Sequence, residues 1–120
     1  DQYMAELART PDAPLYANPE PYLYQAPNPR PIHAYRDAFL SGDATAAHAN
    51  WRNLSPLRPI YDRWVIGQLD QGHSPVPALK HWARRMGLAT GPVRFPLEPL
   101  APAAARQLDA ELDGAGVPLG

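Results

Sequence analysis

The sequence predicts a mainly α-helical protein, for three reasons. Apolar residues recur at helical spacing in several segments, proline and glycine stand at the segment boundaries, and the runs that could form strands are confined to the first 30 residues. Sixteen of the 120 residues are proline, against an average of about 5%. Because each proline fixes φ and removes a backbone donor, we interpret the prolines as boundaries between short helices of one domain.

The composition excludes several classes of protein. A net charge of −1 offers no field that would attract nucleic acid or an anionic membrane, and the tryptophans at 51, 64 and 82 are expected to pack rather than to stack on bases. No apolar run approaches the roughly 20 residues that span a bilayer, and no signal peptide opens the chain. The absence of cysteine excludes a disulfide framework and favours the cytoplasm. We therefore expect a cytoplasmic protein with no nucleic-acid or membrane partner.

Residues 1–30 are expected to differ from the rest of the chain. Residues 2–9 have the pattern of the end of an amphipathic helix. Residues 13–17 form a short apolar run that fits a buried strand, and in the proline-rich stretch that follows only Tyr22–Gln25 is free to pair in a sheet. The first 30 residues are thus predicted to combine a helix end with short strands, and residues 31–120 to form a helical domain.

The helical domain is predicted from apolar periodicity bounded by proline and glycine. Pro31 suits a first helical position, Gly42 suits the left-handed cap that ends a helix, and Asp43 suits the N-cap of the next. Pro56 and Pro59 should break the helix that follows. The expected helices lie near 31–41, 43–70 with this break, 75–86 and 102–113, the last with the leucines at 108 and 112 on its inner face.

The sequence predicts no metal or cofactor site. A zinc site usually draws two ligands from one short spacing, whereas the four histidines of this chain are widely separated. Neither a glycine-rich phosphate loop nor a G-x-S-x-G motif occurs, and the serines at 41, 55 and 74 suit capping or turns. The histidines, which we expect to act independently, are His33, His48, His73 and His81.

Lys80, the only lysine of the chain, is a candidate nucleophile because a desolvated lysine can form an imine with a carbonyl substrate. No carboxylate or tyrosine is spaced to relay protons to it, so we expect Lys80 not to be catalytic. With Arg84, Arg85 and Arg94 it forms the densest cationic patch. Since arginine is favoured near a helix C-terminus, we interpret the patch as a solvated helix face, with an anion site as the alternative.

Four short elements follow one another in the helical domain. A small residue followed by Gly-Asp ends one helix, Leu-x-Pro-Leu lies in the next, a third begins near proline and carries a lysine, and G-x-V-R-x-P-L-x-P-L precedes the last. The residues are Ser41–Asp43, Leu54–Leu57, Pro75–Gly87 and Gly91–Leu100. In order and spacing, over about residues 31–117, they resemble the C-terminal part of the dihydrodipicolinate synthase and N-acetylneuraminate lyase family.

The resemblance implies the C-terminal helical tail of a (β/α)8 TIM barrel of about 250 residues, of which this chain would keep at most the last one or two strands. Members of the family are class I aldolases or hydro-lyases that form a lysine imine with a pyruvate-type 2-oxo acid, without a cofactor. Their catalytic lysine and tyrosine would lie upstream of residue 1, and neither Tyr3 nor Lys80 occupies a matching position. The resemblance therefore assigns no catalytic, cofactor-binding or metal residue to this chain and leaves its substrate-binding residues unknown.

The resemblance also implies a structural role for Gly91–Leu100. In the family this segment crosses the helical domain and packs its apolar residues beneath the last helix. We therefore expect Val93, Phe95, Leu97 and Leu100 to be buried.

The first 30 residues depart from the family pattern. If residues 14–17 and 22–25 stand for the seventh and eighth barrel strands, only residues 18–21 connect them, whereas a βα crossover needs at least about 10 residues. Either the helix between the two strands has been lost, residues between them are absent from this sequence, or the assignment of the two strands is wrong.

The resemblance thus implies the C-terminal part of a lysine-imine aldolase, lyase or dehydratase. We expect the complete enzyme to bind a small 2-oxo acid, and this part to associate with the rest of a barrel or with further copies of itself. One alternative is a small helical interaction module without enzymatic activity. A third reading is a stand-alone enzyme that uses Lys80.

Overall fold

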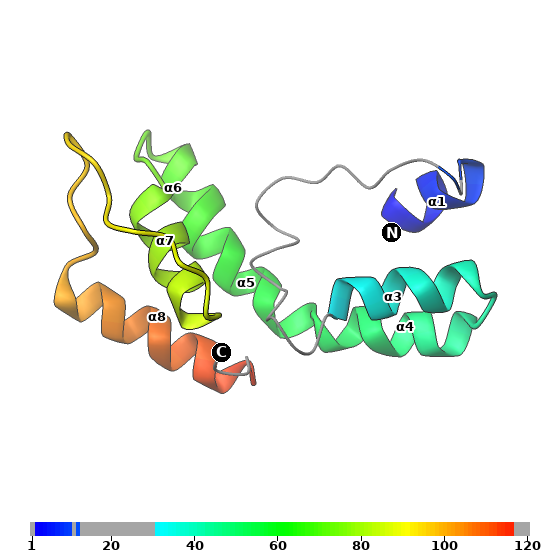
Figure 1. The fold of residues 1–120 in the computed structure, drawn as a ribbon. Coiled ribbons are helices and arrows are strands. Elements are labelled where there is room, and N and C mark those ends of the chain that lie inside the picture. Colours follow the sequence, from blue (N-terminus) through cyan, green and yellow to red (C-terminus); the bar gives the residue numbers. More distant parts are fainter. Residues whose placement is uncertain (1, 11, 13–30, 117–120) are drawn as a thin grey trace.

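A computed structural model describes residues 2–10, 12 and 31–116, and within these residues the chain is mainly helical and contains no strand (Figure 1). The strands expected at 13–17 and 22–25 lie outside the described residues. No helix in the described part of the chain is both long and apolar enough to cross a membrane. The helices are α1 (Gln2–Arg9), α3 (Pro31–Leu40), α4 (Ala44–Asn53), α5 (Arg58–Tyr61), α6 (Gly67–Asp70), α7 (Val76–Arg85) and α8 (Pro102–Gly114).

Helices α4, α5 and α6 follow one another as a nearly continuous rod, shown in green in Figure 1. The rod is interrupted by a 3-10 turn at Ser55–Leu57, which contains Pro56, and Pro59 follows in the first turn of α5. Neither proline has a backbone donor, and the predicted break is confirmed. A π turn follows, in which the N–H of Gly67 donates to the carbonyl of Asp62. A Cβ at residue 67 would lie 3.2 Å from that oxygen, so glycine permits the wide turn.

The turn between α3 and α4 contains the cap residues that the sequence predicts. Gly42 adopts a φ of +81°, and the N–H of Asp43 donates to the carbonyl of Ala38 at 2.9 Å, which closes α3. The carboxylate of Asp43 accepts a hydrogen bond from the N–H of Ala46 at 2.9 Å and caps α4. The two helices therefore pack as an antiparallel hairpin.

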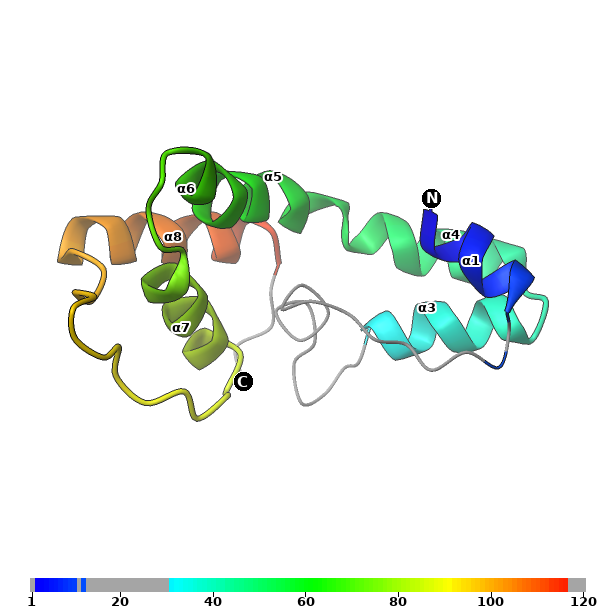
Figure 2. The same cartoon turned by 90° about the horizontal axis from the view of Figure 1, so that it is seen from above.

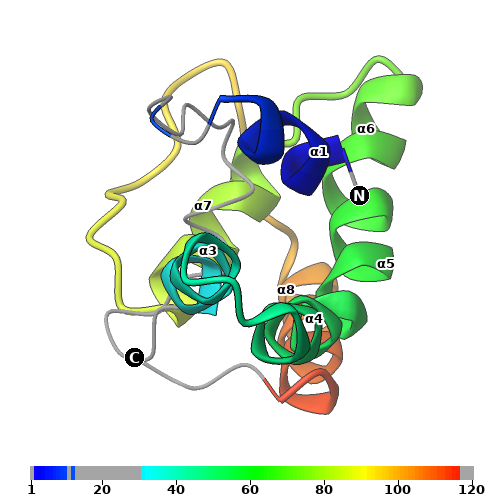
Figure 3. The ribbon, with the colours of Figure 1, turned by 90° about the vertical axis from the view of Figure 1, so that its right-hand side faces the viewer.

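The helices form two groups along an elongated molecule of 45 × 26 × 23 Å. The α3–α4 hairpin occupies one end, and α5 to α8 pack together at the other (Figure 1, Figure 2). Residues 88–101, which we call the strap, connect α7 to α8. The strap lies on the opposite side of α7 from α5 and α6 (Figure 3).

The main core lies among α5, α7 and α8. Trp82 of α7 and Leu108 and Leu112 of α8 are 0% exposed, which confirms the predicted inner face of the last helix. Trp64, on the π turn, is 8% exposed, so two of the three tryptophans pack in the core as expected. The buried residues of the cluster are Leu54, Leu57, Ile60, Trp64, Ala78, Trp82, Met86, Leu108 and Leu112.

The strap packs only in part as the sequence predicts. Leu100 contacts the main core, and Val93 and Leu97 are half-buried, but Phe95 is 95% exposed. The prediction that Phe95 is buried is therefore wrong. Residues 93, 95 and 97 share one side only in an extended chain, and here the chain turns, with the N–H of Leu97 donating to the carbonyl of Arg94 at 3.0 Å.

Candidate functional site

The most connected polar side chain between α5 and α8 is Glu111. Its Oε1 accepts hydrogen bonds from Arg63 at 2.6 Å and from Gln107 at 3.1 Å, and its Oε2 accepts one from the indole of Trp64 at 2.9 Å. Three donors thus share one carboxylate, and two of them come from the π turn Asp62–Ile66. The sequence analysis did not identify Glu111, because these contacts join residues far apart in the chain.

The surroundings of Glu111 determine the direction in which its pKa is shifted. Burial of the carboxylate raises its pKa, but the hydrogen bonds from Trp64 and Gln107, together with the charge and the hydrogen bond of Arg63, outweigh this effect, so the pKa of Glu111 lies below its ordinary value. A carboxylate with a lowered pKa is a weak base. Since both oxygens already accept hydrogen bonds, Glu111 is suited to joining helices and not to proton transfer.

A second polar cluster joins α7 to α8. Asp109 Oδ1 lies 2.9 Å from His81 Nε2 and 3.2 Å from Arg85 Nε, and Arg85 Nη2 pairs with Asp113. The pattern follows from helix geometry, because residues 81 and 85, and likewise 109 and 113, are one turn apart on their helices. Arg85 is therefore neutralised by carboxylates, and the cationic patch is smaller than the sequence predicts.

Lys80 lies half-buried on α7 and contacts the strap. Its ammonium donates to the main-chain carbonyls of Thr90 and Pro92, both at 2.8 Å. In return, the hydroxyl of Thr90 donates to the carbonyl of Lys80 at 3.2 Å. Attack of this nitrogen on a ketone would require breaking both bonds from the ammonium, so the geometry fits a lysine that fastens the strap.

The other residues considered in the sequence lie apart from these clusters. Arg84 and Arg94 are exposed, as are His33, His48 and His73. In residues 2–10, 12 and 31–116, no group of three or more His, Cys, Asp or Glu side chains is placed to hold a metal ion. The remaining tryptophan, at 51, is half-buried, stacks with the ring of the histidine at 48 and lies 4.3 Å below the guanidinium of the arginine at 58.

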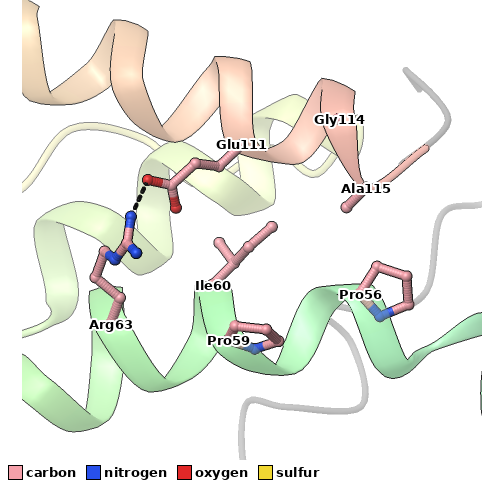
Figure 4. Close-up of a pocket in the computed structure, with 7 residues that line it drawn as sticks. All are labelled: Pro56, Pro59, Ile60, Arg63, Glu111, Gly114 and Ala115. Atoms are coloured by element: carbon pink, nitrogen blue, oxygen red, sulfur yellow. Dashed lines mark hydrogen bonds and ion pairs between the residues drawn. The ribbon is translucent and has the colours of Figure 1, made fainter.

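A groove of about 290 Å³ opens between α5 and the C-terminal end of α8 (Figure 4). The Arg63–Glu111 ion pair lies at one end, and the rest of the lining is apolar. We call it the α5–α8 groove, and its lining residues are Pro56, Pro59, Ile60, Arg63, Glu111, Gly114 and Ala115.

The described polar side chains are therefore used mainly to hold α8 and the strap against α7 and α5. Arg63 and Arg85 pair with carboxylates, Lys80 binds main-chain oxygens, and Glu111 and Asp109 accept from several donors. Such an arrangement can support packing and docking. No protein-family model, curated protein or solved structure matches the chain.

Proposed function

We propose that this chain is the C-terminal helical part of an enzyme that forms a lysine imine with a pyruvate-type 2-oxo acid, an aldolase, lyase or dehydratase whose catalytic residues lie upstream of the chain. The observation that carries the proposal is the contact of Lys80 with the strap. Lys80, the only lysine of the chain, holds the segment that carries the G-x-V-R-x-P-L-x-P-L motif by the carbonyls of Thr90 and Pro92.

The order of the helices supports the proposal. The resemblance implies a helix closed by a small residue and Gly-Asp, a second helix that contains Leu-x-Pro-Leu, a third that begins near proline, and a fourth after the motif. The chain turns through Ser41–Asp43 after α3, has its 3-10 turn at Ser55–Leu57, begins α7 after Pro75 and begins α8 at Pro102. The helix boundaries thus agree with the motif order.

The roles of the polar side chains also support the proposal that the described residues are structural and that the catalytic residues lie elsewhere. Imine formation needs an unprotonated amine with a general acid within about 3 Å. The nitrogen of Lys80 donates to two carbonyl oxygens, and the carboxylates of Asp109 and Glu111 join helices. In this proposal the described residues are a scaffold, and the chemistry belongs to a barrel on the same or another chain. Barrel enzymes carry their active sites at the C-terminal ends of the strands.

The experiment uses a polypeptide that extends upstream of Asp1. It is incubated with pyruvate and borohydride, which reduces an imine to a stable adduct, and the modified lysine is located by peptide mass mapping. We expect an adduct on a lysine upstream of Asp1 and none on Lys80. The matched control, Lys80→Met in the same polypeptide, should keep the adduct.

Two results would contradict the proposal. An adduct on Lys80 would support a stand-alone enzyme that uses this lysine. A folded extended polypeptide with no adduct on any lysine would support the alternative, a helical interaction module without enzymatic activity.

A further inference from the structure

Phe95 is the most exposed large apolar side chain of the described residues, at 95%, and the next, Leu69, is 54% exposed. A single exposed apolar side chain is common on protein surfaces and by itself indicates nothing. Phe95 differs in its setting, because the strap that carries it is fixed on both sides. Lys80 holds the strap at Thr90 and Pro92 before Phe95, and Leu100 contacts the core after it.

A hydrogen-bonded turn presents this side chain to solvent. The N–H of Leu97 donates to the carbonyl of Arg94 at 3.0 Å, so residues 94–97 form a closed turn with Phe95 at its second position. An aromatic ring held on a turn loses little conformational freedom on binding, which favours its use as an anchor. We call the turn 94–97 the hook.

The α5–α8 groove has the size and lining that a phenyl ring needs. An apolar cavity of about 150 Å³ holds benzene, and the groove has about 290 Å³, which leaves room for adjoining atoms of the hook. Pro56, Pro59 and Ile60 line one side, and Gly114 and Ala115 line the other (Figure 4). A phenyl ring in this groove would contact mainly carbon atoms.

The charges beside the hook and the groove are complementary. Arg94 and Glu98 are exposed on either side of Phe95. At the end of the groove the side chain of Arg63 is 62% exposed and that of Glu111 is 21% exposed. Glu98 beside the hook can therefore pair with the exposed guanidinium of Arg63, whereas Glu111 already accepts from three donors, and this charge match favours a particular partner and register.

The hook and the groove of one chain lie at opposite ends of α8. The strap leads into α8 at Pro102, whereas Gly114 and Ala115 of the groove lie at its other end. Thirteen helical residues separate the two ends by roughly 18 Å at a rise of about 1.5 Å per residue. Phe95 is 95% exposed and so does not occupy the groove of its own chain, whereas a second copy of the chain carries both this ring and the Glu98 that matches Arg63.

We propose that two copies of this chain associate by inserting Phe95 of each into the α5–α8 groove of the other. A two-fold axis allows both contacts to form at once. The two contacts are small compared with the roughly 1,200 Å² or more of a stable interface, so the dimer dissociates on dilution. The inference does not depend on the proposed function, because both surfaces lie within this chain.

Sedimentation velocity over a range of chain concentrations tests the proposal with two variants that we expect to fold normally. Phe95→Ala removes an exposed ring. Gly114→Leu fills the groove, and it suits the fold because Gly114 is helical, a Cβ there meets nothing within 4 Å, and leucine favours a helix more than glycine does. We expect each substitution to raise the dimer dissociation constant by about tenfold or more, as for a central interface side chain.

Two further variants are matched controls. Phe95→Leu keeps an apolar hook and should retain the dimer, and Leu69→Ala removes an exposed apolar side chain elsewhere and should leave the dissociation constant unchanged. A wild-type chain that stays monomeric at every concentration would overturn the proposal and favour burial of Phe95 against a different protein surface. A dimer that persists in either Phe95→Ala or Gly114→Leu would also overturn it, because hook and groove are two halves of one contact.

Discussion

The indole nitrogen of Trp64 donates a 2.9 Å hydrogen bond to Oε2 of Glu111, 47 residues further along the chain. Trp64 belongs to the buried core and is 8% exposed, so this bond satisfies its only polar atom at the edge of the core. The same carboxylate pairs with Arg63. Glu111 therefore fixes α8 against the π turn. We expect its replacement to lower the stability of the fold.

Replacement of Glu111 by alanine should destabilise the chain by about 1–3 kcal/mol, because the indole of Trp64 loses its acceptor. Glu111→Gln keeps an acceptor oxygen and should therefore lose less free energy of unfolding than Glu111→Ala. Urea denaturation followed by tryptophan fluorescence measures both free energies of unfolding. If both variants lose the same free energy of unfolding, the stabilisation comes from the negative charge of Glu111, and its hydrogen bond with Trp64 contributes nothing further.

The stability of the chain should also fall in acid through Glu111. The folded pKa of Glu111 is lowered from its ordinary value of 4.5, so between the two pKa values the unfolded state binds more protons. This contribution is complete above about pH 4.5 and is lost as the pH falls through the folded pKa. Melting temperatures measured from neutral to acidic pH should therefore fall more steeply in the wild type than in Glu111→Gln. If the melting temperatures of the two proteins fell equally with pH, Glu111 would not be the source of this acid sensitivity.

Phe95→Ala should change the free energy of unfolding by no more than about 0.5 kcal/mol, because the ring is 95% exposed. Leu108→Ala, at a site that is 0% exposed, should cost about 2–5 kcal/mol. Denaturation at concentrations below self-association compares the two. A loss for Phe95→Ala as large as that for Leu108→Ala would show that the ring packs in the core after all.

Most helix boundaries could be predicted from the sequence, because local chemistry determines them. Gly42 and Asp43 form the expected caps, and Pro102 begins α8. Several boundaries differ by one residue; α7, for example, begins at Val76, whose N–H lies 3.4 Å from the hydroxyl of Ser74. Such features depend on φ angles and on donors within one turn of the chain.

The candidate site could not be predicted, because long-range contacts determine it. Arg63 and Glu111 are 48 residues apart, and periodicity does not indicate which acid of α8 faces α5. Phe95 was predicted to be buried because the resemblance implies an extended segment packed beneath the last helix and the spacing of its apolar residues suits that, but the turn at 94–97 breaks the extended path. Hydrophobicity indicates that a side chain can be buried, whereas the path of the backbone decides whether it is.

Lys80→Met should lower the stability by about 1–3 kcal/mol, because two hydrogen bonds from a charged group to the strap are lost. It should also release the strap, so that trypsin cleaves after Arg94 faster than in the wild type. Arg84→Ala, an exposed site on the same helix, is the control and should stay within about 0.5 kcal/mol of the wild type. Unchanged cleavage after Arg94 in Lys80→Met would contradict the fastening role.

The central claim is that Lys80 fastens the strap and does not act as an imine-forming nucleophile. Incubation of the 120-residue chain with pyruvate and borohydride tests this most directly, because Lys80 is its only lysine and peptide mapping distinguishes it from the N-terminal amine. We predict no adduct on Lys80, since its nitrogen donates to the carbonyls of Thr90 and Pro92. A pyruvate adduct on Lys80 would contradict the account and identify this lysine as a nucleophile.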